Sequence, residues 1–283
     1  MRSPSPVVRA LAALAALALV ALAGCGAPRE KGLTIKGSDT MILIGQRWAE
    51  TFMSSHPGRA VQVTGGGSGT GIAALINGTT DICQASRAMK DEERAQLEKR
   101  FGQSPVETVV ARDGIAIYAN EACPVAELSF AQLKGIYTGA ITNWKAVGGA
   151  DAPIVVYGRE NSSGTYVYFK EHVLEGTDFA AAVQTLPGTA AVVNAVAKEP
   201  NGIGYGGAAY AAGVKEIAVR RDSTGAAIRP SRESVLSGEY PISRPLYFYT
   251  RSAPVGLAKE FVDFALSDAG QKLVEEVGYY PVR

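Results

Sequence analysis

Two short segments of this sequence combine glycines with hydroxyl side chains in a pattern that suits anion binding. Residues 65–71 read GGGSGTG, and residues 159–165 read RENSSGT. Each segment is expected to open a helix, whose first turn presents unpaired N–H groups and a partial positive charge. Arg159 adds a planar guanidinium that matches the geometry of an oxyanion. We therefore expect these two segments, far apart in the sequence, to hold one small oxyanion from opposite sides.

Residues 37–40 (GSDT) form a third turn of this kind. In the expected order of strands and helices, all three turns lie where a strand ends and a helix begins. Ligands of open α/β sheets bind at the carboxyl ends of the strands. Ser68, Ser163 and Thr165 can each donate a hydroxyl hydrogen bond, and glycines let backbone N–H groups approach a ligand closely. Each hydrogen bond to a charged ligand contributes about 1.5–3 kcal/mol, so several together support tight binding.

Each of these features also has a purely structural explanation. Asp39 fits the N-cap of a following helix. Arg87 fits a partner for the acidic cluster at residues 91–93, and Arg159 fits a surface pair with Glu160. A single glycine-rich turn is more often a tight turn than a ligand site. Their coincidence at one position in the strand–helix order is what favours binding.

Residues 1–24 have the pattern of a secretory signal. A basic start precedes an unbroken apolar run at residues 10–23, which is shorter than a membrane span requires. The sequence LAGC, which ends at Cys25, resembles a bacterial lipobox, in which the cysteine is lipidated and becomes the first residue. Residues 25–32 are then a lipid-anchored tether. An ordinary signal followed by a chance cysteine is the alternative.

The chain that follows the signal is nearly neutral. Removing 24 of the 283 residues leaves 259, and the loss of Arg2 and Arg9 leaves 26 of the 28 basic residues against 27 acidic ones. No basic tract interrupts the chain, which argues against a nucleic-acid partner. An anion-binding protein without net positive charge must select its ligand by local geometry rather than by long-range attraction.

Strands and helices are expected to alternate, which predicts an α/β fold. Two β-rich segments, residues 106–120 and 246–250, are expected to cross between two lobes joined by a hinge. Domain 1 is then discontinuous, at residues 33–118 and 246–283, and domain 2 lies at residues 119–245. The other expected strands lie at residues 33–36, 60–64, 81–85, 154–157 and 202–206, and the expected helices at residues 41–56, 72–76, 90–100, 129–137, 166–173, 190–197, 255–266 and 267–277.

Enzyme and metal-site motifs are not found. Residues 65–71 lack the Lys of a P-loop, the dinucleotide fingerprint and the register of a nucleophile elbow. His56 and His172 do not adjoin the glycine-rich segments, so a Ser-His-Asp hydrolase is not expected. No metal-ligand spacing occurs, and we expect neither metal nor cofactor. Cys83 and Cys123 are compatible with a disulfide or with two buried core residues, and the sequence leaves both open.

At residues 37–40, 65–71, 81–87 and 159–165 the chain resembles the phosphate-binding lipoproteins of the Pst-type ABC importer. The resemblance extends over nearly the whole mature chain. Supporting matches lie at residues 128–130, 143–144, 202–205 and 278–282. The resemblance implies the two-lobed, type II periplasmic-binding-protein fold, which closes on its ligand by hinge motion. It implies phosphate contacts from Ser38, Asp39, Thr40, Ser68, Ser86, Arg87, Arg159, Ser163, Gly164 and Thr165.

The sequence departs from some members of that family at two positions. Some relatives have an aspartate where Arg87 stands, and its carboxylate accepts a hydrogen bond from the proton of phosphate, which sulfate lacks. We hypothesise that Asp39 fills this role here. Asn161 stands where some members have an acidic residue that orients the arginine, which leaves Glu160 for that role.

The resemblance implies an extracytoplasmic receptor that is lipid-anchored to the membrane and is not an enzyme. It would capture inorganic phosphate and deliver it, as a monomer, to the membrane permease subunits of an ABC importer. The nearest alternative is the same fold binding sulfate, molybdate or tungstate. Less expected alternatives are a secreted phosphate-ester hydrolase that uses a serine of residues 65–71, and a cell-surface interaction protein with a vestigial site.

Overall fold

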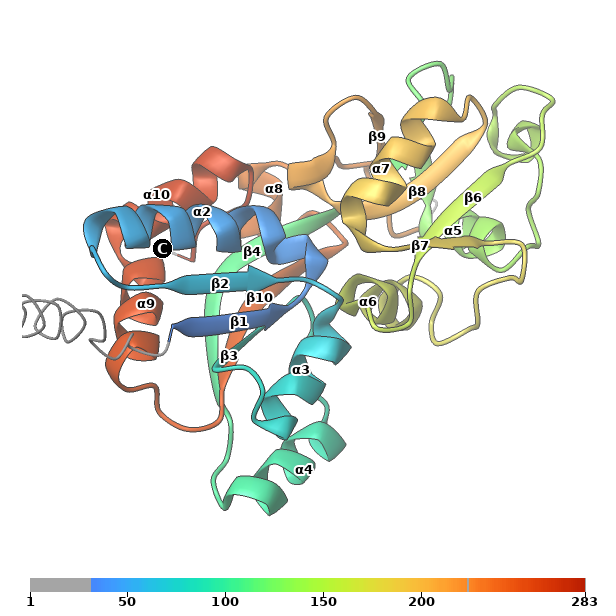
Figure 1. The fold of residues 1–283 in the computed structure, drawn as a ribbon. Helices are drawn as coiled ribbons and strands as arrows, with labels where there is room; N and C mark the ends of the chain where they lie inside the picture. The colour runs from blue at the N-terminus through green and yellow to red at the C-terminus, as the bar shows by residue number, and fades with distance from the viewer. Residues whose placement is uncertain (1–31, 223, 283) are drawn as a thin grey trace, which may run out of the picture. The chain divides into compact units, whose positions relative to one another are not determined.

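The chain alternates strands and helices, as the sequence pattern predicts (Figure 1). The structure is a computed structural model and describes residues 32–222 and 224–282. The predicted signal segment and Cys25 lie outside the described residues, as does the predicted tether apart from residue 32.

The described strands are β1 (Leu33–Gly37), β2 (Val61–Thr64), β3 (Ile82–Ala85), β4 (Val106–Ala119), β5 (Glu127–Ser129), β6 (Val155–Arg159), β7 (Gln184–Leu186), β8 (Gly202–Gly207), β9 (Lys215–Arg220) and β10 (Ser243–Thr250). The described α-helices are α2 (Ile42–Ser55), α3 (Ser68–Asn77), α4 (Asp91–Phe101), α5 (Phe130–Tyr137), α6 (Gly164–His172), α7 (Gly188–Lys198), α8 (Arg232–Leu236), α9 (Gly256–Leu266) and α10 (Asp268–Val277). Short 3-10 turns lie at η1 (Asp39–Met41), η2 (Trp144–Val147) and η3 (Ala208–Tyr210).

One path of hydrogen-bonded strands runs through the molecule in the order β2-β1-β3-β10-β4-β8-β6-β7. β1, β2 and β3 are parallel to one another, and β6 is parallel to β7 and β8. β10 is antiparallel to both β3 and β4. β9 pairs with β4 and β5 beside the main path. Parallel strands joined through helices are the arrangement that an α/β sequence predicts.

β4 and β10 are the strands that connect the two ends of this path. β4 pairs with β10 between residues 106 and 114 and then continues to pair with β8 and β9 between residues 115 and 119 (Figure 1). We call β1–β3 with helices α2, α3, α4, α9 and α10 the first lobe, and β5–β9 with helices α5–α8 the second lobe. The domain boundaries predicted after residues 118 and 245 stay a prediction.

The core of the first lobe fixes the turn that follows β1. α2 buries Ile44, Trp48 and Phe52 on its inner face. The Trp48 indole N–H donates to the Gly270 carbonyl oxygen at 2.9 Å, and its ring meets that of Phe248 edge-on, with centroids 5.5 Å apart. Burial of each large apolar side chain contributes about 1.5–3 kcal/mol. The helix is therefore held firmly, and with it the η1 turn just before it.

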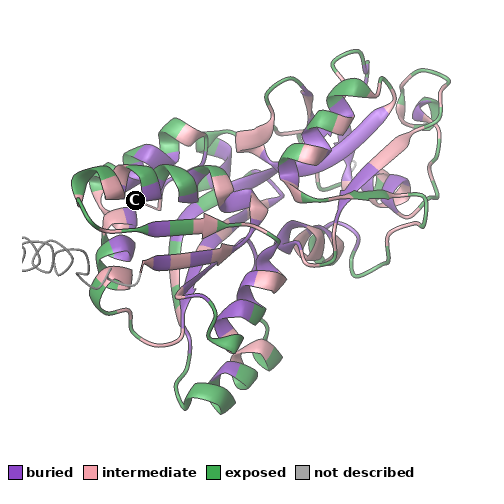
Figure 2. Ribbon diagram, in the orientation of Figure 1, coloured by how far each residue is buried: buried purple, intermediate pink, exposed green. Residues whose placement is uncertain are grey.

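The core of the second lobe anchors α6 in the same way. The Phe169 ring of α6 stacks on Tyr205 of β8 with centroids 4.1 Å apart. The Tyr137 ring of α5 meets the Phe169 ring edge-on, with centroids 4.9 Å apart. All six residues of β8 are buried. Buried residues gather along β4, β8 and β10, and exposed residues on the outer faces of the helices (Figure 2).

The two described cysteines are buried in the cores and free. Cys83 belongs to a cluster in the first lobe and Cys123 to the main cluster of the second. Of the two arrangements that the sequence leaves open, the structure therefore has the unpaired one. Burial raises the pKa of the Cys83 thiol. None of the described helices is long and apolar enough to cross a membrane.

Candidate anion-binding site

The residues singled out by the sequence lie at the carboxyl ends of strands. β1 leads into η1, β2 into the loop before α3, β3 into Ser86, and β6 into the loop before α6. Because β1, β2 and β3 are parallel neighbours, their carboxyl ends meet at one edge of the first lobe. The loop after β6 reaches that edge from the second lobe, where the Gly69 N–H donates to the Ser162 carbonyl oxygen at 2.9 Å.

Both glycine-rich segments place a helix N-terminus at this edge. α3 begins at Ser68, after Gly66 and Gly67, whose φ angles of 109° and 91° favour glycine. A Cβ atom on Gly67 would also lie 2.5 Å from the Ser162 carbonyl oxygen of the second lobe. α6 begins at Gly164, which lies directly against Ser68. Two helix N-termini therefore approach each other from the two lobes, as the sequence pattern predicts.

Buried hydroxyl groups gather between these helix ends. Ser38 Oγ donates to Ser86 Oγ at 2.8 Å, Ser68 Oγ lies 3.3 Å from Ser86 Oγ, and the Ser86 N–H donates to Ser68 Oγ at 3.0 Å. Across the lobes, Thr40 Oγ1 and Thr165 Oγ1 lie 2.9 Å apart. None of these five residues is more than 2% exposed. Several hydroxyl donors in so dry a site match the acceptor oxygens of a tetrahedral anion.

Ser163 caps α6 and is buried at the same edge. Its Oγ accepts from the backbone N–H groups of Thr165 and Tyr166, at 3.2 and 3.3 Å. An oxygen that accepts from the helix end retains its own proton as a donor. The capping role and the predicted ligand-binding role of Ser163 are therefore compatible.

Arg159 is held between the lobes by two partners. Its Nη2 donates to Asp39 Oδ2 at 2.9 Å and its Nη1 to Thr189 Oγ1 at 2.7 Å, and the residue is 1% exposed. Burial lowers the pKa of the Arg159 guanidinium, and the Asp39 carboxylate opposes that shift. Its Nε is buried and has no hydrogen-bond partner among the described residues. A buried cation with an unused N–H is suited to an anion.

These contacts exclude the purely structural roles that the sequence allowed for Arg159 and Asp39. Arg159 does not form a surface pair with Glu160, and its orienting carboxylate is Asp39 rather than Glu160. Asp39 is not an N-cap, because it lies inside η1 and its Oδ1 accepts from the Gly66 N–H at 2.8 Å. Asp39 thus connects the first turn, the glycine-rich loop and the arginine of the other lobe.

Arg87 has the structural role that the sequence offered as an alternative. Its Nη1 and Nη2 donate to Glu93 at 2.8 and 2.7 Å, and its Nη1 also to the Ala88 carbonyl oxygen. Burial raises the pKa of Glu93 by itself, but hydrogen bonds from Arg87 and the Lys90 N–H outweigh it and hold that pKa below its usual value. The buried Nε of Arg87 has no partner in residues 32–222 and 224–282. Arg87 thus borders the site with its Nε–H and the second N–H of Nη2 outside these contacts.

A third arginine at the site was missed by the sequence analysis. Arg244 of β10 donates from Nε and Nη2 to Asp113 Oδ2 of β4, at 3.1 and 2.8 Å. Its Nη2 also reaches Thr40 Oγ1 and Thr165 Oγ1 at 3.3 and 2.9 Å, and its Nη1 donates to the Ser86 carbonyl oxygen at 2.9 Å. The available signal was a charge at each predicted crossing segment, since Asp113 lies within residues 106–120 and Arg244 lies two positions before residues 246–250. Thr189, the second partner of Arg159, was also missed and had no signal.

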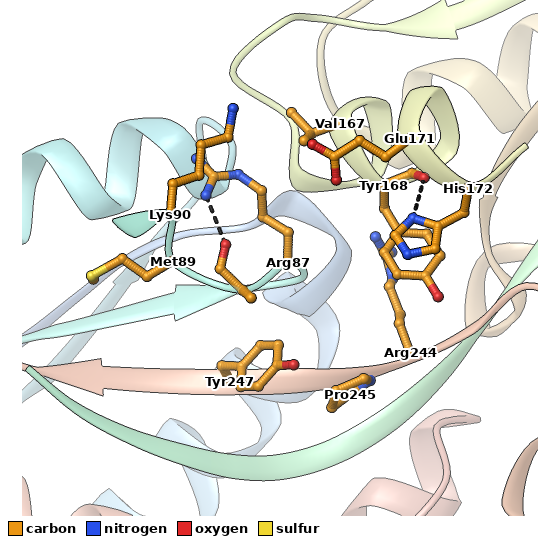
Figure 3. A pocket seen from close by; sticks show the side chains of 11 residues that line it. Arg87, Met89, Lys90, Val167, Tyr168, Glu171, His172, Arg244, Pro245 and Tyr247 are labelled. Carbon is orange, nitrogen blue, oxygen red and sulfur yellow. Dashed lines mark hydrogen bonds between the residues drawn. The ribbon is translucent and has the colours of Figure 1, made fainter. Parts of the chain in front are cut away.

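A pocket of about 430 Å³ adjoins this cluster between the lobes (Figure 3). Arg87 and Lys90 lie on its first-lobe side, and His172 of α6 on its second-lobe side, with Tyr247 of β10 between them. Arg244 also lines the pocket, so the pocket and the hydroxyl cluster share this arginine.

The structure brings most of the predicted residues together. The following are linked to one another by direct contacts, with Arg87 at their border: Ser38, Asp39, Thr40, Ser68, Ser86, Arg159, Ser163, Gly164 and Thr165. The two histidines lie apart from the serines. His56 stacks on Phe52, and His172 stacks on Tyr168 and contacts its carbonyl oxygen. In the described part of the chain, no Ser-His-Asp triad is assembled.

The structure has two α/β lobes joined by crossing strands, with helix N-termini and buried hydroxyls between them. This is the architecture of substrate-binding proteins of the periplasmic-binding-protein type. The sequence matches the PBP superfamily domain over residues 25–269, and the chain belongs to this family.

Relatives within this family are named for phosphate. The chain is 34% identical over 267 residues to the phosphate-binding protein PstS of Pseudomonas aeruginosa, covering 88% of this chain and 83% of that protein. It is 35% identical over 251 residues to the phosphate-binding protein PstS of Bacillus subtilis, covering 88% and 80%. A phosphate-bound ABC transporter substrate-binding protein of Clostridium perfringens superposes with a TM-score of 0.81 and 32% identity, over 89% of this chain and 100% of that one.

Proposed function

We propose that this protein binds inorganic phosphate between its two lobes and delivers it to the permease subunits of an ABC importer. The single observation that carries the proposal is the convergence of two helix N-termini, buried hydroxyls and Arg159 from both lobes on one small region. The names of its relatives and of the solved neighbour select phosphate from the tetrahedral anions, and binding over hydrolysis.

The phosphate ligands in this proposal are the residues that the resemblance implies. Hydroxyl groups come from Ser38, Thr40, Ser68, Ser86, Ser163 and Thr165, backbone N–H groups from the first turns of α3 and α6, and guanidinium N–H groups from Arg159 and Arg87. Such donors stabilise an anion that has left water, because each hydrogen bond to a charged group contributes about 1.5–3 kcal/mol. Arg87 contributes through its Nε and the second N–H of Nη2, since Glu93 and Ala88 occupy both N–H groups of Nη1 and one of Nη2.

Asp39 supplies selectivity in this proposal. Each of its oxygens accepts one hydrogen bond, from the Gly66 N–H and from Arg159, and each has a second lone pair. A protonated phosphate can donate to such an oxygen, whereas sulfate cannot and is repelled by the carboxylate. The same residue therefore orients the arginine and reads the proton of the ligand.

The predicted domains complete the transport role. Residues 33–118 and 246–283 form one binding half and residues 119–245 the other, and hinge motion about β4 and β10 opens and closes them. Cleavage of residues 1–24 and lipidation of Cys25 place the receptor, as a monomer, on the outer side of the membrane beside the permease. Several acyl chains on one residue hold a protein stably at a bilayer, whereas one chain alone does not.

Titration calorimetry with phosphate, and with sulfate, molybdate and tungstate as competitors, tests the proposed function. We expect micromolar or tighter phosphate binding and a clear preference over the other three anions, given the number of charge-assisted hydrogen bonds. Heat signals from sulfate or molybdate alone would assign the protein to another oxyanion. No signal from any of the four would remove the binding function.

A further inference from the structure

Arg244 is a buried arginine of the crossing strand β10 that contacts residues of both lobes. It lies on the crossing strand β10, and its guanidinium is 1% exposed, as is its partner Asp113 on the crossing strand β4. The Tyr168 ring of α6 covers it, with the guanidinium carbon 5.6 Å from the ring centre. Arg244 is therefore fixed from three sides, by both crossing strands and by a second-lobe helix.

The nitrogens of Arg244 reach both lobes from this position. Nη1 donates to the Ser86 carbonyl oxygen, which belongs to the turn after β3 in the first lobe. Nη2 contacts the hydroxyl oxygens of Thr40 in the first lobe and Thr165 in the second. It has two N–H groups, of which Asp113 takes one, so the two threonine oxygens share the other.

This sharing fixes the direction of the threonine protons. A guanidinium is a donor only, so each threonine oxygen that faces Nη2 must accept, and its proton must point elsewhere. The two hydroxyls lie 2.9 Å apart, so one proton serves the bond between them. The second proton points away from Nη2 and is left to donate to a further acceptor. The cation also polarises both hydroxyl groups, which strengthens them as donors.

We propose that Arg244, held by Asp113, is a positioning residue that orients the paired hydroxyls of Thr40 and Thr165 so that the pair donates one hydrogen bond to a bound tetrahedral anion. The proposal rests on the proposed phosphate-binding function. Arg244 does not need to touch the anion, because it acts through one hydroxyl from each lobe. Arg244 contacts both hydroxyls at once only when the two lobes are together. The strength of this hydrogen-bond donor therefore depends on closure of the lobes.

Calorimetry on a double-mutant cycle tests this role. Arg244→Lys keeps the charge but has one nitrogen in place of the planar fork, and we expect phosphate affinity to fall about tenfold. Thr165→Val removes the hydroxyl with little change in volume and should also weaken binding. If Arg244 acts through the threonines, Arg244→Lys lowers affinity clearly less in the Thr165→Val background than in the unmodified protein, because only the Thr40 hydroxyl is then left for it to orient.

A purely structural arginine gives a different result. In that case the two losses multiply in the double variant, or Arg244→Lys keeps the affinity of the unmodified protein, and either outcome overturns the proposal. Arg112→Lys is the matched control, because Arg112 lies on β4 next to Asp113 and is exposed. Failure of the unmodified protein to bind phosphate would refute the proposed function instead, and so is distinct from a failure of this inference.

A second pair of variants covers the case in which Arg244→Lys does not fold. Arg244→Gln combined with Asp113→Asn removes both buried charges at once, so no unpaired charge is left in the interior. Folding is checked by the midpoint of thermal unfolding without phosphate. The same coupling with Thr165→Val is expected in this background, and independent losses would overturn the proposal.

Discussion

Arg159 and Asp39 pair across the two lobes, and this pair sets the charge of the site. The Arg159 side chain is 1% exposed and that of Asp39 16% exposed, so neither charge is well solvated. Arg87 and Arg244 also have carboxylate partners, Glu93 and Asp113. With its cations paired, the site must hold an anion mainly through oriented N–H and O–H groups. Selectivity is then a matter of which groups donate and which accept.

Replacing Arg159 tests the cation at the centre of this arrangement. Arg159→Ala removes two or more donors and leaves the Asp39 carboxylate unpaired beside the anion. We expect phosphate binding to weaken by about 2–5 kcal/mol, measured by calorimetry. Arg47→Ala, which removes a half-exposed arginine of α2, is the control and should bind normally. A loss below about 1 kcal/mol would place Arg159 outside the site.

Replacing Asp39 tests how the site distinguishes phosphate from sulfate. Asp39→Asn keeps one oxygen for the Gly66 N–H or Arg159 but removes the negative charge and one acceptor. Sulfate should bind better, because nothing then repels it, and the ratio of phosphate to sulfate affinity should fall. Asp91→Asn makes the same charge change at an exposed position of α4. An unchanged affinity ratio in Asp39→Asn would show that another group reads the proton.

The limits of prediction at this scale follow from sequence distance. The residue types in the glycine-rich turns were informative because each turn is local. Arg244 and Asp113 lie 131 positions apart, and neither stands in a motif of its own. The link between Arg159 and Asp39 spans 120 positions, so Glu160, next in sequence, seemed the natural carboxylate. The turns that converge at the lobe boundary were thus predictable from the sequence, and the residues that hold their side chains in place were not.

At the scale of elements, the N-terminus of α4 connects an ion pair to the edge of the site. Glu93 in its first turn accepts from the Lys90 N–H at 2.8 Å and from Arg87. The carboxylate therefore caps the helix and fixes the arginine that borders the anion site. Its lowered pKa means that the folded protein favours the ionised form.

This lowered pKa predicts an acid-sensitive contribution of Glu93 to stability. A carboxylate whose pKa is lower in the folded than in the unfolded chain stabilises the fold above the unfolded pKa. That stabilisation is lost as the pH falls through the folded-state pKa. Glu93→Gln cannot titrate, so it should be less stable at pH 7 but lose less stability between about pH 5 and pH 3. Urea unfolding across this range measures the difference.

A neighbour in the same helix provides the control for this experiment. Glu92 lies one position earlier and is exposed. Glu92→Gln should therefore show the same pH dependence of unfolding free energy as the unmodified protein. Parallel curves of unfolding free energy against pH for Glu93→Gln and the unmodified protein would contradict the capping role.

Elements with their own apolar periodicity or a recognisable turn at their end were predictable, and strands without either signal were not. Helices such as α2 and α9 carry their own apolar periodicity, and β1, β2 and β3 end at recognisable turns. β5, β7 and β9 were missed. They have three, three and six residues and exist through pairing with partners distant in sequence, such as that of β9 with β4. Short strands take their conformation from tertiary context, which single-sequence patterns do not contain.

At the scale of the whole molecule, the site exists only where the two lobes touch. Direct hydrogen bonds cross the boundary from Thr40 to Thr165, from Arg159 to Asp39 and from Gly69 to Ser162. The hydroxyl of Tyr210 in the second lobe also donates to the Asp39 carbonyl oxygen at 2.8 Å. Ligand affinity therefore depends on how closely the lobes can approach.

Gly164 is the position where this approach is tightest. A Cβ atom there would lie 2.7 Å from Ser86 Oγ and closer still to Ser68 Oγ, both in the other lobe. Hydrogen bonds from Ser38 and from the Ser86 N–H hold these hydroxyls, so they cannot turn aside without loss. The backbone of Gly164 has no positive φ, and alanine suits a helix start, so α6 itself should form normally.

Gly164→Ala should therefore weaken phosphate binding through closure and leave each lobe intact. Overpacking of this kind costs about 1–3 kcal/mol in the closed arrangement only, which is roughly 5- to 150-fold in affinity. Calorimetry measures the loss, and small-angle scattering with saturating phosphate should give a larger radius of gyration than for the unmodified protein. Gly225→Ala, where a Cβ atom would meet only Asp222 at 3.5 Å, is the control. Unchanged affinity in Gly164→Ala would mean that the lobes bind phosphate without the close contact between α6 and the serines of the first lobe.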